Sequence, residues 1–206
     1  MNDIMPRFEF RIFGTSLGMA EQRLRMITRC DSITESREIY LLGSGPVFDK
    51  NLKIRDGRLE LKQLIQHHEG LQRWQPAGQW EFPVTLEAIE GILYSSDAHD
   101  PARDLSAMLS QDDLLQLATQ SAAHLRRANV FKRRFRFTLP ACDAEFDQLL
   151  VNGAAIESIA VESENPQAIL EAQSALQLED FENQSYPLAL SRILGLTPLP
   201  SEEDYG

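Results

Sequence analysis

The feature that most constrains this fold is a charged side chain at every second residue, repeated in several separate segments. In RFEFRIF, residues 7–13, Arg7, Glu9 and Arg11 alternate with Phe8 and other apolar residues. The same period of two recurs in 51–64, 131–139 and 144–164. Because successive side chains of a strand point to opposite faces, the pattern predicts several strands with one apolar and one charged face.

Turn signals and helical spacing complete this prediction. Asp56-Gly57 and Asn152-Gly153 each interrupt an alternating segment, and such pairs favour tight hairpin turns between antiparallel strands. Ser110, followed by Asp113, predicts the beginning of a helix. We expect helices over 15–27, 85–93, 110–128, 165–178 and 186–195. The chain is therefore predicted to be α+β, with a mainly antiparallel sheet and helices between its parts.

Composition excludes some classes of partner. The 206 residues carry a formal net charge of -11, which argues against nonspecific binding of nucleic acid. No apolar run approaches the ~18 residues of a membrane span, and the first residues lack the apolar segment of a secretory signal. We therefore expect a cytoplasmic protein with no nucleic-acid or membrane partner.

A dense basic strand indicates a smaller polyanion. In FKRRFRFTL, residues 131–139, the side chains of Lys132, Arg134 and Arg136 share one face. Arginine and lysine bind phosphate oxygens well, and a local basic pocket can do so within an acidic protein. Glu162 and Glu164 lie one strand step apart, and such carboxylates can share Mg²⁺ or Mn²⁺.

Alternating charge has a simpler interpretation that stays open at this point. A charged strand face usually looks at water, and the sheet would then be structural. The alternative is a sheet that bends until its charged face encloses a tunnel. Such an interior needs ligands or counter-ions, because like charges that lose water repel one another.

The order of these motifs resembles the CYTH superfamily, the triphosphate tunnel metalloenzymes. The similarity is carried by RFEFR, KIRDGRLELK, FKRRFRF, EFDQLLVNGAAIESIAVESENP and SYPLALSRILG, which together span most of the chain. The resemblance implies an antiparallel β tunnel of about eight strands with helices packed outside. It implies one domain over residues 1–197, followed by an acidic flexible tail over 198–206.

The resemblance also implies a site. Basic residues on several strands would line the path of a triphosphate, while carboxylates would hold the metal and carry the catalysis. The implied substrate-binding residues are Arg11, Lys53, Arg55, Lys62, Lys132, Arg134 and Arg136. The implied catalytic and metal-binding residues are Glu9, Glu162 and Glu164, with Mg²⁺ or Mn²⁺ as cofactor.

One departure leaves catalysis open. The family begins with Glu-x-Glu-x-Lys, whereas this chain has Arg7, Glu9 and Arg11 at those positions. Metal-dependent binding of a triphosphate compound is the leading expectation, with hydrolysis preferred to adenylate cyclase activity. The alternative is a non-catalytic CYTH-like module that binds a phosphorylated ligand or an acidic partner. A homodimer is neither required nor excluded.

Overall fold

The computed structural model describes residues 5–43, 48–93, 106–120 and 125–198. The long strands are β1 (Arg7–Gly14), β2 (Ser32–Leu42), β3 (Lys50–Arg55), β4 (Arg58–His68), β5 (Leu71–Glu81), β8 (Arg126–Leu139), β9 (Cys142–Val151) and β10 (Ala154–Ser163). The helices are α1 (Gly18–Ile27), α2 (Leu86–Leu93), α3 (Gln111–Gln120), α4 (Pro166–Leu176) and α5 (Tyr186–Ile193), and a small sheet joins β6 (Val84–Thr85) to β7 (Met108–Leu109).

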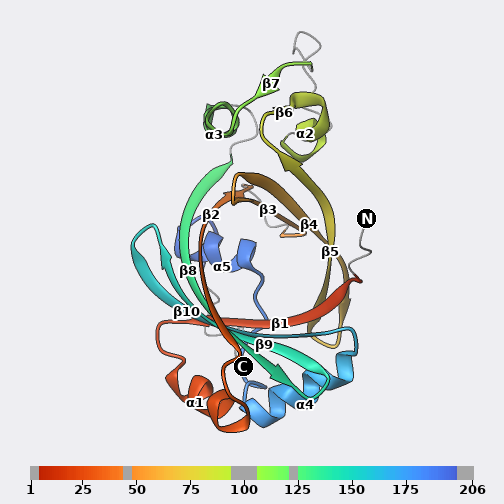
Figure 1. The fold of residues 1–206 in the computed structure, drawn as a ribbon, viewed down its shortest axis with the longest axis vertical. Coiled ribbons are helices and arrows are strands. Elements are labelled where there is room, and N and C mark those ends of the chain that lie inside the picture. Colours follow the sequence, from red (N-terminus) through yellow and green to blue (C-terminus); the bar gives the residue numbers. More distant parts are fainter. Residues whose placement is uncertain (1–4, 44–47, 94–105, 121–124, 199–206) are drawn as a thin grey trace.

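The long strands close into a barrel in the order β1-β10-β9-β8-β2-β3-β4-β5, and β5 pairs again with β1 (Figure 1). Every neighbouring pair is antiparallel. The predicted α+β fold with an eight-stranded antiparallel tunnel is therefore confirmed. The charged face of the sheet lies inside the barrel, where Arg11 is 3% exposed and Lys132 2%. The interpretation of that face as a solvated surface is wrong.

The hairpin turns follow their sequence signals. Asp56 and Gly57 have φ of 51° and 70°, and Asn152 and Gly153 have 48° and 95°. These left-handed conformations suit Gly, Asn and Asp, which explains why both turns were readable. A further hairpin turns at Glu69-Gly70, with φ of 49° and 78°. It was not predicted, because Glu rarely adopts this conformation.

The predicted helix over 110–128 is correct at its beginning and wrong at its end. Ser110 Oγ accepts a hydrogen bond from Asp113 N at 3.2 Å, while Asp113 Oδ2 accepts one from Ser110 N at 2.9 Å. The helix ends at Gln120, and β8 has already begun at Arg126. The first residues of β8 pair with the end of β2, and this long-range pairing overrides the helical preference of a local segment.

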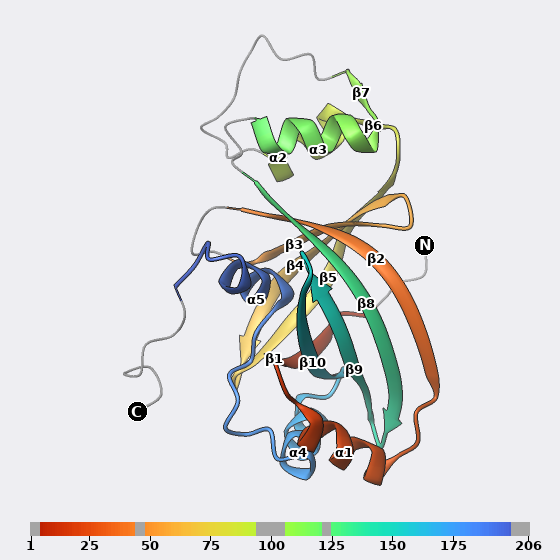
Figure 2. The same cartoon turned by 90° about the vertical axis from the view of Figure 1, so that its left-hand side faces the viewer.

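Helices cover the barrel at three places (Figure 2). α1 and α4 pack on the outer face of β1, β9 and β10 through an apolar cluster that includes Leu24 and Ile169. α2 and α3 pack on the outer face of β2, β3 and β4, at the opposite end of the molecule, through Ile89 and Leu114. α5 lies across one end of the barrel, where Leu190 joins a buried apolar cluster with residues of β2, β8 and β9. The interior is thereby covered at the α5 end.

Two sequence expectations fall mainly on residues outside the described ranges. The polar loop over 94–107 is described only from 106, and the acidic tail over 198–206 only at 198. Among the described helices, none is both long enough and apolar enough to cross a membrane.

Candidate functional site: a charged cavity inside the barrel

The barrel encloses a cavity of about 520 Å³, within the range of small-molecule sites. Its walls are formed by inward-facing side chains from the strands, and its floor at the α5 end includes Tyr40 and Tyr186. The cavity brings together nine of the predicted site residues: Glu9, Arg11, Lys53, Arg55, Lys62, Lys132, Arg134, Arg136 and Glu162. Glu164 does not line it, because β10 ends at Ser163 and the Glu164 side chain is exposed.

Four acidic residues in or beside this cavity were missed at the sequence level: Glu38, Glu60, Glu145 and Asp147. Each lies at an inward position of its strand and forms ion pairs with the predicted basic residues. In the register of β8 with β9, Arg136 faces Glu145 and Arg134 faces Asp147. Acids and bases therefore interleave on the inner face of the barrel and largely neutralise one another.

Arg11 lies at the centre of the acidic residues. Its Nε donates to Glu9 Oε1 at 2.6 Å, and its Nη1 lies 3.3 Å from Asp147 Oδ2. Its Nη2 donates to Glu145 Oε1 and lies 3.8 Å from Glu162 Oε1. One buried guanidinium thus contacts carboxylates from β1, β9 and β10.

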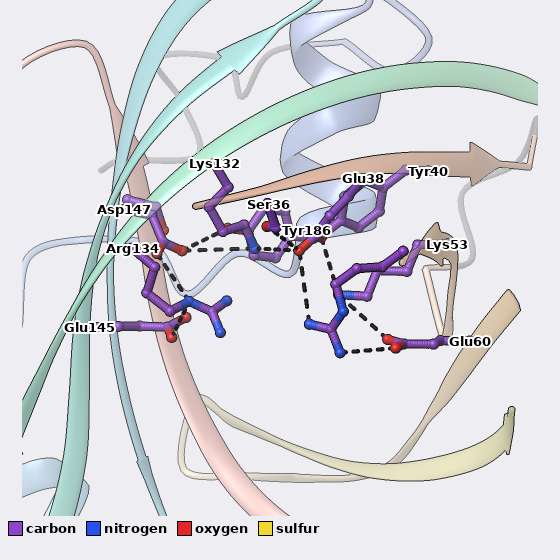
Figure 3. Close-up of polar contacts among 12 residues, drawn as sticks. Ser36, Glu38, Tyr40, Lys53, Glu60, Lys132, Arg134, Glu145, Asp147 and Tyr186 are labelled. Carbon is purple, nitrogen blue, oxygen red and sulfur yellow. Dashed lines mark hydrogen bonds and ion pairs between the residues drawn. The ribbon is translucent and has the colours of Figure 1, made fainter. Parts of the chain in front are cut away.

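Lys132 lies on the floor of the cavity between two buried carboxylates (Figure 3). Its Nζ is 3.6 Å from Glu38 Oε1 and 3.9 Å from Asp147 Oδ2. Tyr40 donates its hydroxyl to Glu38 at 2.7 Å, and Tyr186 donates to Asp147 at 2.8 Å. The two tyrosine rings stack with centroids 5.3 Å apart. Burial lowers the pKa of Lys132 to about 8, although both carboxylates oppose the shift.

The remaining inner cations are also paired. Arg134 Nε lies 2.8 Å from Glu145 Oε2, and Arg55 Nη2 donates to Glu60 Oε1 at 2.9 Å. Lys53 Nζ lies 3.8 Å from Glu60 Oε2 (Figure 3). Burial opposes ionisation of Glu145, but the charges of Arg11 and Arg134 outweigh it and hold the pKa of Glu145 at about 2. This inner network is therefore charged and internally compensated.

The rim of the cavity differs from this inner network. Lys62 and Arg136 are exposed and line the cavity, and neither forms an ion pair with any other residue that the structure describes. Arg7, which stands where the resembled motif has its first acid, pairs with Asp143 at 2.6 Å. Cationic donors are thus available at the rim, where solvent and ligands reach them.

A divalent cation would need the cavity carboxylates Glu9 and Glu162, which the resemblance assigns to the metal. Glu9 and Glu162 face each other in the register of β1 with β10, but Glu9 is bonded to Arg11. Burial raises the pKa of Glu162 to about 7, and the charges of Glu9 and Glu145 add to the rise. Over the described ranges, no three His, Cys, Asp or Glu residues are arranged to hold a metal ion, so the residues do not fit Mg²⁺ or Mn²⁺.

Comparison with known proteins supports the fold and leaves the chemistry open. No protein-family model and no curated protein matches the chain. Among solved structures, HpAC1 from Hippeastrum matches with a TM-score of 0.50 at 13% identity, covering 94% of this chain and 98% of the other. It is described as an adenylyl cyclase candidate with a dominant triphosphatase activity.

Two further structures lie just below that level of similarity. A conserved hypothetical protein from Pyrococcus furiosus has a TM-score of 0.49 at 18% identity, covering 90% of this chain and 98% of the other. An adenylate cyclase candidate from Bacillus halodurans has a TM-score of 0.48 at 15% identity, covering 88% of this chain and 97% of the other. The likeness to HpAC1 shows a shared fold.

Proposed function

We propose that this protein binds a small phosphorylated polyanion, with a triphosphate compound as the preferred ligand, at the rim of its barrel cavity. The observation that carries the proposal is the contrast in pairing. Lys62 and Arg136 have no ion-pair partner in the described chain, whereas Arg11 and Lys132 are surrounded by carboxylates. Phosphate oxygens would supply the missing anionic partners of the rim.

The size and shape of the site agree with such a ligand. A cavity of about 520 Å³ accommodates a triphosphate chain and leaves room for an attached organic group. Arg134 belongs to the inner network but lies next to Arg136 on the same face of β8, and its side chain is 17% exposed. It can therefore extend the phosphate path inward. The fold shared with HpAC1, which is described as having triphosphatase activity, supports the same class of ligand.

Metal-dependent hydrolysis with Mg²⁺ or Mn²⁺ is the finer prediction, and the cavity does not favour it. The ion pair of Glu9 with Arg11 occupies one of the carboxylates that the resemblance assigns to the metal. Glu164 lies outside the cavity, and no three-ligand cluster exists in the described residues. We therefore favour the second hypothesis from the sequence, a CYTH-like module that binds the ligand without metal-dependent turnover.

Calorimetric titration with tripolyphosphate in the presence of EDTA tests the binding. We expect saturable one-site binding that weakens with added salt, as phosphate recognition by exposed cations requires. Absence of heat at millimolar tripolyphosphate, with inorganic phosphate and ATP equally silent, would remove the proposed function.

A separate assay tests turnover. Release of phosphate and pyrophosphate is measured with tripolyphosphate, ATP and thiamine triphosphate, each with Mg²⁺ or Mn²⁺, and Glu162→Ala serves as the control. We expect no release above the control. Metal-dependent release that Glu162→Ala abolishes would show that the protein is an enzyme. Release of pyrophosphate from ATP without free phosphate would indicate a cyclase.

A further inference from the structure

Four carboxylates from three strands converge on a single guanidinium inside the barrel. Glu9 comes from β1, Glu145 and Asp147 from β9, and Glu162 from β10. All four contact Arg11, through Nε, Nη1 and Nη2. The two closest contacts are direct charge-assisted hydrogen bonds, from Nε to Glu9 and from Nη2 to Glu145.

This donor set is the kind that a hard divalent cation prefers. Mg²⁺ and Mn²⁺ are bound by carboxylate oxygens, several of which must converge on one point. Here the carboxylates converge instead on a planar cation that is wider than a metal ion and binds them through separate nitrogens. Because the oxygens are spread around this larger group, they are not arranged as a compact metal site.

Arg11 is also held firmly in place. Its side chain is 3% exposed, and Nη1 donates a further hydrogen bond to Ser158 Oγ at 3.2 Å. The guanidinium carbon lies 4.8 Å above the ring of Tyr186. The backbone is fixed as well, because Arg11 N donates to Asn183 Oδ1 at 2.9 Å and Arg11 O accepts from Gln184 N at 2.7 Å. These contacts fix the guanidinium among the four carboxylates.

We propose that Arg11 is a built-in cation that takes the place of a divalent metal among these carboxylates and excludes metal from the cavity. The inference concerns the free protein and does not depend on which ligand the rim binds. It assigns the exclusion of metal to the guanidinium of Arg11, which contacts all four carboxylates. Arg7, which replaces an acid of the resembled motif, pairs with Asp143 at 2.6 Å and forms no ion pair with Glu9, Glu145 or Asp147 in the described chain, although its Nη2 donates to the backbone carbonyl of Glu162 at 3.5 Å.

Titration with Mn²⁺, followed by electron paramagnetic resonance of the free ion and by calorimetry, tests this inference without any assay of activity. The wild-type protein should show no specific Mn²⁺ site at millimolar concentration. Arg11→Gln removes the charge and frees the carboxylates, so it should bind Mn²⁺ at least about tenfold more tightly than the wild type. Its midpoint of thermal unfolding should also rise with Mn²⁺, as binding to the folded state requires.

Two variants provide matched controls. Arg134→Gln removes a cavity arginine that forms ion pairs with Glu145 and Asp147 but none with Glu9 or Glu162 in the described chain, and it should not gain a Mn²⁺ site. Arg7→Glu adds an acid at the rim and should not gain one either. Equal Mn²⁺ binding by Arg11→Gln and Arg134→Gln would overturn the assignment to Arg11.

The wild-type titration decides the question even if Arg11→Gln does not fold. A wild-type Mn²⁺ site that Glu9→Gln abolishes would show that metal and Arg11 share the carboxylates, and the proposal would then be wrong. A folded Arg11→Gln variant that binds no Mn²⁺ would also contradict it.

Discussion

Lys62 and Lys132 line the same cavity, yet their surroundings differ in almost every respect. Lys132 lies on the floor, 2% exposed, with two carboxylates within 4 Å and the ring of Tyr186 4.1 Å from its Nζ. Lys62 lies at the rim, exposed, and has no ion pair in the described chain. A charge on an inward strand position therefore does not by itself indicate a ligand contact.

The difference follows from solvation. A buried ion loses several kcal/mol of hydration, so it persists only where the protein supplies counter-charges and hydrogen bonds. An exposed ion keeps its hydration, so it can remain without a counter-ion in the free protein at little cost to stability. The floor of this cavity is accordingly built for stability, whereas the rim is left available for binding. The following predictions, ordered from the largest expected effect to the smallest, test that division.

Lys132→Met should cause the largest loss of stability. It removes the cation between Glu38 and Asp147 and leaves both carboxylates buried, so we expect a loss of about 3–5 kcal/mol in the free energy of unfolding. Urea denaturation measures this loss. Arg133→Met, at the adjacent outward position on β8, should change stability by no more than about 0.5 kcal/mol. Similar values for the two variants would contradict a structural role of the floor.

Tyr186→Phe should have a smaller effect of the same kind. The ring and its stacking on Tyr40 remain, but Asp147 loses the hydrogen bond from the Tyr186 hydroxyl. A hydrogen bond to a charged group contributes about 1.5–3 kcal/mol, and we expect a loss of that size in urea denaturation. An unchanged unfolding midpoint would show that Asp147 is satisfied without Tyr186.

Unlike the two floor variants, Lys62→Met should affect ligand binding more than stability. Loss of one charge-assisted contact with phosphate should weaken tripolyphosphate binding by roughly tenfold, about 1.4 kcal/mol, in a calorimetric titration. The free energy of unfolding should change by no more than about 0.5 kcal/mol. Lys50→Met, an exposed position on the same hairpin that does not line the cavity, should leave both quantities unchanged.

The pH dependence of binding should show the smallest effect. Glu162 is faced by Glu9 from β1, Glu145 from β9, Lys62 from β4 and Arg11, and burial with the two carboxylates raises its pKa to about 7. As pH rises through 7, Glu162 loses its proton and becomes an anion that repels the ligand. Between pH 6 and pH 8 we therefore expect the affinity of the wild type for tripolyphosphate to fall about two- to fivefold more than it would without this ionisation, as a nearby charge in a solvated site predicts.

Glu162→Gln should remove this additional weakening. Tripolyphosphate also changes its charge with pH, but this affects the wild type and the variant equally. The ratio of their affinities at each pH therefore reports on Glu162 alone. If the two proteins keep the same ratio of affinities from pH 6 to pH 8, the raised pKa of Glu162 has no part in binding.

The residue pattern was sufficient for the charged strand faces and two of the hairpin turns, whereas the closed barrel was expected only from the family resemblance. Alternation places Lys132, Arg134 and Arg136 on one face of β8, whichever strands pair with β8. Asp56-Gly57 likewise specifies the turn between β3 and β4 from local sequence alone. These features depend only on neighbouring residues. They were accordingly predicted with the correct face and the correct turn.

The counter-ions could not be predicted in the same way. Glu38 lies in the middle of β2. The proximity of Glu38 to Lys132 depends on the register of β2 with β8. The contacts of Arg11 depend on the registers of β1 with β10 and of β10 with β9. Such pairings join residues far apart in the chain. Local alternation therefore identified the charges, and only the closed barrel showed which of them neutralise each other.

The most direct test of this account is a calorimetric titration of tripolyphosphate, in EDTA, into the wild type and into a Lys62→Gln/Arg136→Gln double variant. Arg133→Gln, on the outer face of β8, serves as the control. Loss of two charge-assisted contacts should weaken binding by about 100-fold, while the control binds as the wild type does. Equal affinities for the double variant and the wild type would contradict a ligand site at the rim.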